Sequence, residues 1–296
     1  MNILLFGKGG QVGWELQRSL SVLGTVTALD FDSTEHCGDF ANPAGVAETV
    51  RALRPDVIVN AAAHTAVDKA ESEADFARTL NATTPGAIAQ EAAKLGAWLV
   101  HYSTDYVFDG SGSRPWVETD TPAPLSVYGR TKREGEQLIA QAGPRHLILR
   151  TSWVYAARGG NFAKTMLRLA QERDRLTVID DQWGAPTGAD LLADVTAHAL
   201  RHLQQRPQDA GLYHCAAAGA TNWNEYAKFV IAQAQITQSA IKIKASEIAP
   251  VPTSAFPTPA VRPHNSRLDT GKLQATFGLK MPHWQAGVAR MLAEIL

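Results

Sequence analysis

Short apolar runs alternate with amphipathic stretches through the first half of the chain. The apolar runs predict β-strands over residues 2–6, 26–30, 56–60, 98–102 and 146–150. Between them, apolar residues recur with the helical period and predict helices over 12–22, 43–53, 74–95 and 127–142. Each helix is long enough for a right-handed crossover between parallel strands. The pattern therefore predicts an α/β fold with a doubly wound parallel sheet.

The alternation becomes less regular after residue 150. It predicts helices over 162–173, 189–205 and 284–296, with short strands at 176–179 and 211–215. Five prolines within 250–263 predict a rigid extended loop, because proline removes a backbone donor and fixes φ. We expect this part of the chain to form a smaller lobe that closes over the sheet.

A glycine-rich loop follows the first predicted strand and opens the first predicted helix. Its sequence, GKGGQVG, places Gly7, Gly10 and Gly13 at G-x-x-G-x-x-G spacing. Glycine lets the backbone turn sharply and approach a pyrophosphate, while the helix N-terminus offers unpaired N–H groups. We therefore expect these glycines, with Gln11 and Val12, to bind a dinucleotide.

Asp30 ends the second predicted strand, 17 residues beyond Gly13. A carboxylate there can bind the adenosine ribose hydroxyls. Its repulsion of a 2′-phosphate favours NADH, but Lys8 offsets part of that repulsion, so NADH and NADPH both stay open. We predict a Rossmann-type dinucleotide-binding domain over 1–150 and about 174–205, and a substrate-binding lobe over about 151–173 and 206–296.

Tyr128 and Lys132 form a Tyr-x-x-x-Lys pair on one face of a predicted helix. Thr104 and Asp105 follow the fourth predicted strand, at the edge where open parallel sheets bind ligands. This set suits carbonyl reduction, in which Tyr128 protonates the alkoxide and Lys132 lowers the tyrosine pKa and holds a ribose hydroxyl. Thr104 would hydrogen-bond the carbonyl oxygen, and Asp105 would orient the network or bind a sugar hydroxyl.

Composition excludes several other classes of protein. The chain carries 28 Lys and Arg against 29 Asp and Glu, so no strong net charge attracts nucleic acid or an anionic membrane. Neither a signal peptide nor a long apolar segment is present, which predicts a cytoplasmic location. Cys37 and Cys215 are far apart and suggest neither a disulfide framework nor a zinc site.

These residues resemble the extended short-chain dehydrogenase/reductases and, within them, the dTDP-4-dehydrorhamnose reductase family. The glycine loop and the Tyr-x-x-x-Lys pair are typical of the whole superfamily. The narrower likeness rests on residues 64–68 (HTAVD), 103–109 (STDYVFD), 183–187 (WGAPT) and 262–268 (RPHNSRL), and it extends almost from end to end of the chain.

The resemblance implies further binding residues. Asp39 and Phe40 would border the adenine of the cofactor. Other residues would line its diphosphate, ribose and nicotinamide, namely Ala62, Ala63, Thr65 and Tyr102. A third group would face the nucleotide sugar together with Tyr128, namely Val67, Thr104, Asp105, Tyr106, Trp153 and Asn161.

The resemblance also implies magnesium at a contact between two subunits of a homodimer. The matching acids are Glu15, Asp190 and Glu294, with aspartate at position 190 where the family has glutamate. A shorter side chain reaches less far, and the sequence alone favours solvated helix-face carboxylates over metal ligands for all three acids.

The implied reaction is reduction of dTDP-4-dehydro-L-rhamnose to dTDP-L-rhamnose by NADPH or NADH, which supplies rhamnose for cell-surface polysaccharide such as lipopolysaccharide O-antigen. Two alternatives share the fold. A nucleotide-sugar epimerase or dehydratase uses the same Tyr and Lys but retains its NAD, and a non-catalytic regulatory subunit can dispense with the proton donor. The HTAVD and RPHNSRL segments argue against the first alternative, and the intact Thr104, Tyr128 and Lys132 set argues against the second.

Overall fold

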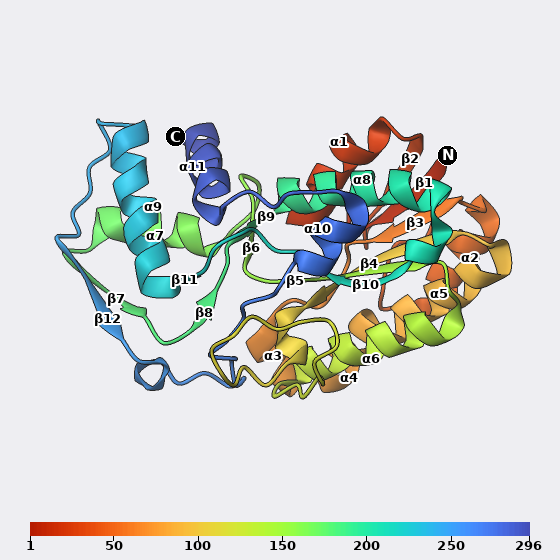
Figure 1. Ribbon diagram of the computed structural model, residues 1–296, viewed down its shortest axis with the longest axis horizontal. Coiled ribbons are helices and arrows are strands. Elements are labelled where there is room, and N and C mark those ends of the chain that lie inside the picture. Colours follow the sequence, from red (N-terminus) through yellow and green to blue (C-terminus); the bar gives the residue numbers. More distant parts are fainter.

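A six-stranded parallel sheet forms the centre of the protein in a computed structural model that describes residues 1–296 (Figure 1). The strands lie in the order β10 (Gly211–His214), β5 (His146–Thr151), β4 (Trp98–Thr104), β3 (Val57–Asn60), β1 (Asn2–Phe6) and β2 (Thr25–Leu29). Every neighbouring pair is parallel. Because β2 and β3 flank β1 on opposite sides, the chain reverses its winding direction there and leaves a crevice at the carboxyl ends of the strands. The predicted doubly wound sheet is confirmed.

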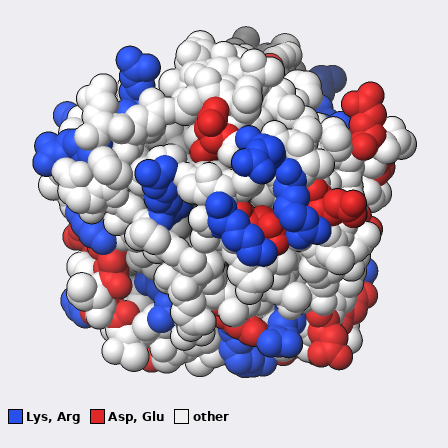
Figure 2. Space-filling view, turned by 90° about the vertical axis from the view of Figure 1, so that its right-hand side faces the viewer, with Lys and Arg blue, Asp and Glu red and all other residues white.

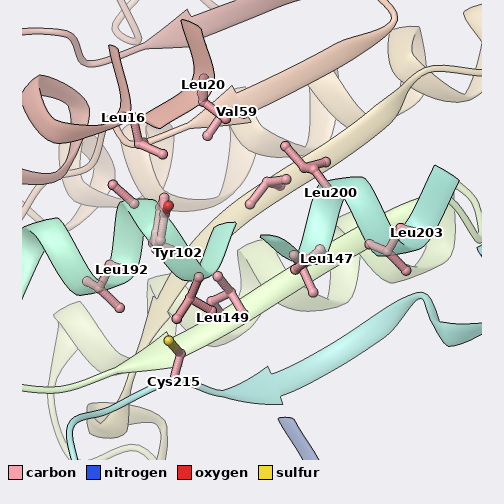
Figure 3. Packing of buried hydrophobic residues seen from close by; sticks show 14 of the residues in the cluster. Leu16, Leu20, Val59, Tyr102, Leu147, Leu149, Leu192, Leu200, Leu203 and Cys215 are labelled. Atoms are coloured by element: carbon pink, nitrogen blue, oxygen red, sulfur yellow. The ribbon is translucent and has the colours of Figure 1, made fainter. Parts of the chain in front are cut away.

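Helices cover both faces of this sheet. One face carries α2 (Pro43–Leu53), α5 (Thr84–Leu95) and α6 (Val127–Ala142), and the other carries α1 (Gln11–Ser21), α8 (Ala189–Gln205) and α10 (Gly271–Phe277). The strands are apolar on both sides, as buried parallel strands require. Figure 3 shows leucines of α1, α8 and β5 interlocking on the second face.

The segment predicted as one helix over 74–95 contains a π-helical turn. It comprises α4 (Ala74–Arg78), the π-helix Thr79–Thr83 and α5. Pro85 has no N–H to donate to the carbonyl four residues earlier, and the wider turn is instead closed by the Thr84 N–H donating to the Thr79 carbonyl. A short helix before this segment, α3 (Val67–Ser72), was not predicted.

The smaller lobe lies to one side of the sheet and has two cores of its own. It contains α7 (Phe162–Glu172), α9 (Trp223–Thr237) and α11 (Trp284–Ile295). Three strand pairs complete it and join it to the sheet domain, namely β7 (Arg175–Ile179) with β12 (Glu247–Val251), β8 (Trp183–Gly184) with β11 (Thr221–Asn222), and β6 (Val154–Tyr155) with β9 (Thr187–Gly188). Helices α9 and α10 were not predicted.

The structure differs from the predicted division of the chain at three segments, one of which is α10, packed on the central sheet. β10 pairs with β5, so residues 211–214 belong to the central sheet and not to the smaller lobe. β7 pairs with β12, so residues 175–179 belong to the smaller lobe. The proline-rich loop is also shorter than predicted, because Pro250 lies within β12 and Thr253–Ala255 forms a 3₁₀ turn. Long-range contacts decide all of these cases, and periodicity along the chain does not reveal them.

The outer face beyond β2 and α2 carries Lys and Arg side chains intermixed with Asp and Glu (Figure 2). This mixture agrees with the formal net charge of −1. None of the helices combines the length and the hydropathy that crossing a bilayer requires.

Candidate active site

The glycine loop packs its backbone directly against the segment that follows β3. Gly7 has φ of +84°, and a Cβ atom there would lie 2.7 Å from the Ala62 nitrogen. A Cβ on Gly13 would overlap the Gly7 carbonyl. Gly10 is the N-cap of α1, is exposed, and makes no side-chain capping bond. The helix therefore presents free N–H groups to the crevice, which suits a pyrophosphate.

Asp30 lies beside this loop, immediately after β2. Its Oδ2 accepts a hydrogen bond from the Gly9 N–H at 2.9 Å, and its Oδ1 accepts one from the Phe31 N–H at 3.1 Å. The carboxylate is thereby fixed at the carboxyl edge of the sheet, next to the loop.

Asp39 and Phe40 follow in the connection to α2. The Asp39 Oδ1 accepts a hydrogen bond from the Ala41 N–H. Phe40 is 4% exposed and meets Phe6 edge to face, with ring centroids 5.4 Å apart. The Phe40 ring lies in the core, so only the Phe40 backbone can border a ligand.

Tyr128 occupies the first turn of α6, which begins after the N-cap residue Ser126. Desolvation raises the Tyr128 pKa to about 12, against the opposing effect of the nearby Thr104 hydroxyl at the end of β4. The Tyr106 ring meets the Tyr128 ring edge to face at 5.5 Å, and the Tyr106 N–H donates to the Thr104 Oγ1. The structure thus brings together the predicted threonine and tyrosine, which sequence places 24 residues apart.

Asp105 is almost fully buried beside them, at 2% exposure. Thr104 donates to its Oδ1 at 3.1 Å, and its Oδ2 has no hydrogen-bond partner within 3.5 Å. Burial raises the pKa of Asp105 to about 6, against the opposing effect of the Ser266 and Thr104 hydroxyls. A buried carboxylate beside Thr104 that has one oxygen without a hydrogen-bond partner is suited to bind a hydroxyl group.

Lys132 lies one turn beyond Tyr128 and is 3% exposed. Its Nζ donates to the Tyr102 carbonyl at 2.6 Å and lies 3.2 Å from the His101 Nε2. Burial lowers the pKa of Lys132 to about 8, while Glu136 acts in the opposite direction. Desolvation dominates the pKa of Tyr128 in this ligand-free chain, and the lowering effect expected of Lys132 stays a prediction.

Tyr102 does not reach the crevice. Its hydroxyl forms a 2.6 Å hydrogen bond with the Thr196 Oγ1 on α8, and its ring lies among the leucines of the core (Figure 3). The Tyr102 side chain is therefore turned away from the expected nicotinamide contact, while the Tyr102 carbonyl fixes Lys132. Strand alternation explains the difference, since adjacent residues point to opposite faces.

Two residues expected to face the sugar have structural partners. Trp153 has φ of +50° and stacks on Trp223 with ring centroids 3.6 Å apart. Asn161 is the N-cap of α7, where its Oδ1 accepts from the Lys164 N–H and its Nδ2 donates to the Ala156 carbonyl. Its amide is fully used by this cap.

An ion pair between the two lobes was missed by sequence reasoning, although both partners lie in the quoted segments. Asp68, next to Val67 in α3, accepts two hydrogen bonds from Arg262, at 3.0 and 2.7 Å. The Ala260 N–H donates to the same carboxylate. The HTAVD and RPHNSRL segments therefore meet at the mouth of the crevice. The available signal was a carboxylate in one motif and a guanidinium in the other, which are opposite charges.

The three acids expected to bind magnesium are not assembled within one chain. No group of three or more His, Cys, Asp or Glu side chains has a metal-binding arrangement. Glu15 lies 3.6 Å from Arg18, and Asp190 lies 3.8 Å from Arg290. The donor set of this single chain does not fit a magnesium ion.

Comparison with known proteins places this geometry in a family. The family described as the RmlD substrate binding domain matches residues 1–296. A dTDP-4-dehydrorhamnose reductase of Shigella flexneri is 62% identical over 100% of this chain and 98% of its own length.

Solved structures of dTDP-4-dehydrorhamnose reductases have the same fold as this chain. A dTDP-4-dehydrorhamnose reductase from Clostridium acetobutylicum is 35% identical, with a TM-score of 0.90 over 100% of this chain and 99% of its own. One from Bacillus anthracis, solved in complex with NADP, is 34% identical, with a TM-score of 0.88 over 99% of each chain. The chain therefore belongs to the RmlD substrate binding domain family, the family of the dTDP-4-dehydrorhamnose reductases.

Proposed function

We propose that this protein reduces dTDP-4-dehydro-L-rhamnose to dTDP-L-rhamnose with NADPH or NADH, the final step of dTDP-L-rhamnose synthesis. The observation that carries the proposal is the contact of Thr104 with Tyr128 at the carboxyl end of β4, in a chain that matches the reductase family over its whole length. The relative from Bacillus anthracis, solved with NADP, supports the cofactor class.

A dinucleotide held by the glycine loop would supply the hydride for reduction of the carbonyl carbon of the sugar. Tyr128 donates its hydroxyl proton to the carbonyl oxygen, which becomes the new alcohol, and the phenolate regains a proton from water. Thr104 donates a hydrogen bond to the same oxygen and polarises the carbonyl. A tyrosine with a pKa near 12 remains protonated at neutral pH, so it is a proton donor throughout the physiological range.

Further residues are proposed to bind the two ligands. The glycine loop would hold the cofactor diphosphate, Asp30 the adenosine ribose, and Lys132 the nicotinamide ribose. Ala62, Ala63 and Thr65 would complete the cofactor site. Asp105 would accept a sugar hydroxyl through its free Oδ2, and Tyr106, Val67 and Trp153 would surround the nucleotide sugar.

The smaller lobe is proposed to bind the sugar nucleotide and the sheet domain to bind the cofactor. A cytoplasmic location and a homodimer are part of the same proposal. Light scattering of the purified protein tests the homodimer, and a mass of one chain, 31.9 kDa, would contradict it.

The decisive assay mixes the protein with NADPH or NADH and freshly generated 4-keto sugar nucleotide. Loss of cofactor absorbance in step with formation of dTDP-rhamnose is the expected result. Rearrangement of a sugar without net oxidation of added cofactor would indicate an epimerase or dehydratase. Tight ligand binding without turnover would indicate a regulatory subunit.

A further inference from the structure

Three buried side chains form a hydrogen-bond chain behind the candidate active site. Asn60 ends β3, His101 lies opposite it on β4, and Lys132 reaches His101 from α6. Their exposed fractions are 1%, 1% and 3%. The Asn60 Nδ2 lies 3.0 Å from the His101 Nδ1, and the His101 Nε2 lies 3.2 Å from the Lys132 Nζ. Because all three side chains are almost fully buried, their donors and acceptors must match one another.

The backbone fixes the orientation of the first member. The Ala62 N–H can only donate, and it donates to the Asn60 side chain at 2.9 Å, so the group that it meets is the amide oxygen. The Asn60 NH₂ group then points at the His101 Nδ1, which must be an acceptor. A neutral imidazole that accepts at Nδ1 carries its hydrogen on Nε2, and this hydrogen faces Lys132.

In this arrangement every hydrogen-bond donor finds an acceptor only when Lys132 is a neutral amine. The amine nitrogen accepts the Nε2–H and still donates to the Tyr102 carbonyl. An ammonium has three donors and no acceptor, so it conflicts with the Nε2–H. The conflict ends if His101 moves its hydrogen to Nδ1. Asn60 must then turn its oxygen toward His101 and lose its bond with the Ala62 N–H.

We propose that Asn60 and His101 are positioning residues that form a two-state hydrogen-bond chain, in which protonation of Lys132 is coupled to the His101 tautomer and to the Ala62 amide. His101 stays neutral in both states. One proton is taken from solvent, and the net change is an ammonium at Lys132 with the imidazole hydrogen on Nδ1.

Other charged groups do not provide this coupling. Glu136 favours the ammonium, but Arg133 and Arg150 both donate to its carboxylate. On the remaining elements around α6, charged groups have other partners, namely Glu71 with the Val127 N–H and Arg78 with Glu134. Asp105 is hydrogen-bonded to Thr104, and the hydrogen bonds of Lys132 go to His101 and the Tyr102 carbonyl, not to Asp105 or Tyr128. His101 is the titratable side chain in direct contact, and burial together with the Lys132 charge holds its pKa well below 6.5.

The hydrogen-bond chain of Asn60, His101 and Lys132 connects the two ligand-binding parts of the site. Ala62 belongs to the segment proposed to line the cofactor, and Lys132 is proposed to hold the nicotinamide ribose. A ligand oxygen that accepts from the Ala62 N–H would release Asn60 and favour the charged lysine. This consequence rests on the proposed function, whereas the two-state chain itself exists in the ligand-free protein and is testable without substrate.

Nitrogen NMR of the ligand-free protein with ¹⁵N-labelled histidine tests the proposal. The one-bond and two-bond ring couplings of His101 report which nitrogen carries the hydrogen. Between about pH 6.5 and about pH 9.5 we expect His101 to change from the Nδ1–H to the Nε2–H tautomer, with a midpoint near pH 8. The Lys132→Met variant should keep the Nε2–H tautomer throughout. A wild-type His101 that keeps one tautomer across this range overturns the proposal.

A second experiment separates the effect of the hydrogen-bond chain on the Lys132 titration from the effect of charge alone. In Asn60→Asp, the carboxylate accepts both the Ala62 N–H and the Nδ1–H, so the Lys132 titration, followed by its own ¹⁵Nζ signal, should move upward by about one pH unit or more. The same substitution in a His101→Phe background keeps the added charge without the imidazole, and we expect at most half of that shift. An equal shift in both backgrounds would show that charge alone acts, and would also overturn the proposal.

Discussion

At the scale of single residues, the site concentrates buried ionisable groups that a stable core would avoid. Asp105 and Lys132 are both nearly inaccessible, and burial shifts the pKa of each toward its neutral form. Such groups cost folding free energy and are typical of functional sites.

Asp105→Asn should stabilise the protein at neutral pH. The folded pKa of Asp105, about 6, lies above the ordinary value of 3.8, so the cost of ionisation develops between about pH 4 and pH 6 and is complete above pH 6. This shift corresponds to about 3 kcal/mol. Urea unfolding at pH 7.5 and pH 4 should show a larger gain at pH 7.5, while kcat falls. A gain that is the same at both pH values would contradict the assigned pKa.

Asp30→Ala should shift the ratio of kcat/KM toward NADPH. Loss of a hydrogen bond to a charged group costs roughly 1.5–3 kcal/mol, or about tenfold or more in NADH use, and the repulsion of a 2′-phosphate disappears. Steady-state kinetics with both cofactors measures the ratio. Asp32→Ala, two residues further along the same connection, is the matched control. An unchanged ratio in Asp30→Ala would remove Asp30 from the cofactor site.

At the scale of elements, the sequence identified the strands and helices around the crevice almost to the residue. Period-two and period-3.6 patterns are local, so β1, α2 and α6 were predictable from short windows. The glycine loop was predictable because its spacing reflects backbone contacts that no other residue allows. The π-turn before Pro85 and the pairing of β7 with β12 depend on contacts with distant segments, which no window contains.

Gly13→Ala tests the junction of β1 and α1. The added Cβ would overlap the Gly7 carbonyl, so the loop must shift, at a cost of about 1–3 kcal/mol and with weaker cofactor binding. Gly160→Ala is the control, because nothing lies within 4 Å of its Cβ position. Thermal unfolding with and without NADPH measures both effects. A Gly13→Ala protein that NADPH stabilises as much as wild type would contradict the assignment of the loop.

At the scale of the whole molecule, the candidate site is assembled from both lobes. Thr104, Tyr128 and Lys132 were predictable as a set because they lie on adjacent elements of the sheet domain. The roles expected of Tyr102 and Asn161 were not borne out by their side-chain contacts, since motif matching does not reveal which way a side chain points. The Asp68 and Arg262 pair needed the three-dimensional structure, because 194 residues separate the partners.

Arg262→Lys should weaken the closure of the lobes over the substrate. Lysine cannot make the two parallel hydrogen bonds that Arg262 makes to Asp68, so substrate KM should rise about tenfold while the affinity for cofactor stays unchanged. Arg168→Lys alters a solvent-exposed pair with Glu172 and serves as the control. An equal rise of KM in both variants would indicate a general loss of stability instead.

The central claim is that Tyr128 protonates the developing alkoxide in a carbonyl reduction. Single-turnover oxidation of NADPH with the 4-keto sugar nucleotide, compared between wild type and Tyr128→Phe, tests it most directly. We predict that Tyr128→Phe lowers the rate by about 10²–10⁴-fold while NADPH still binds, because the phenol is not needed to hold the diphosphate. A Tyr128→Phe protein that reduces the sugar at nearly the wild-type rate would contradict the account.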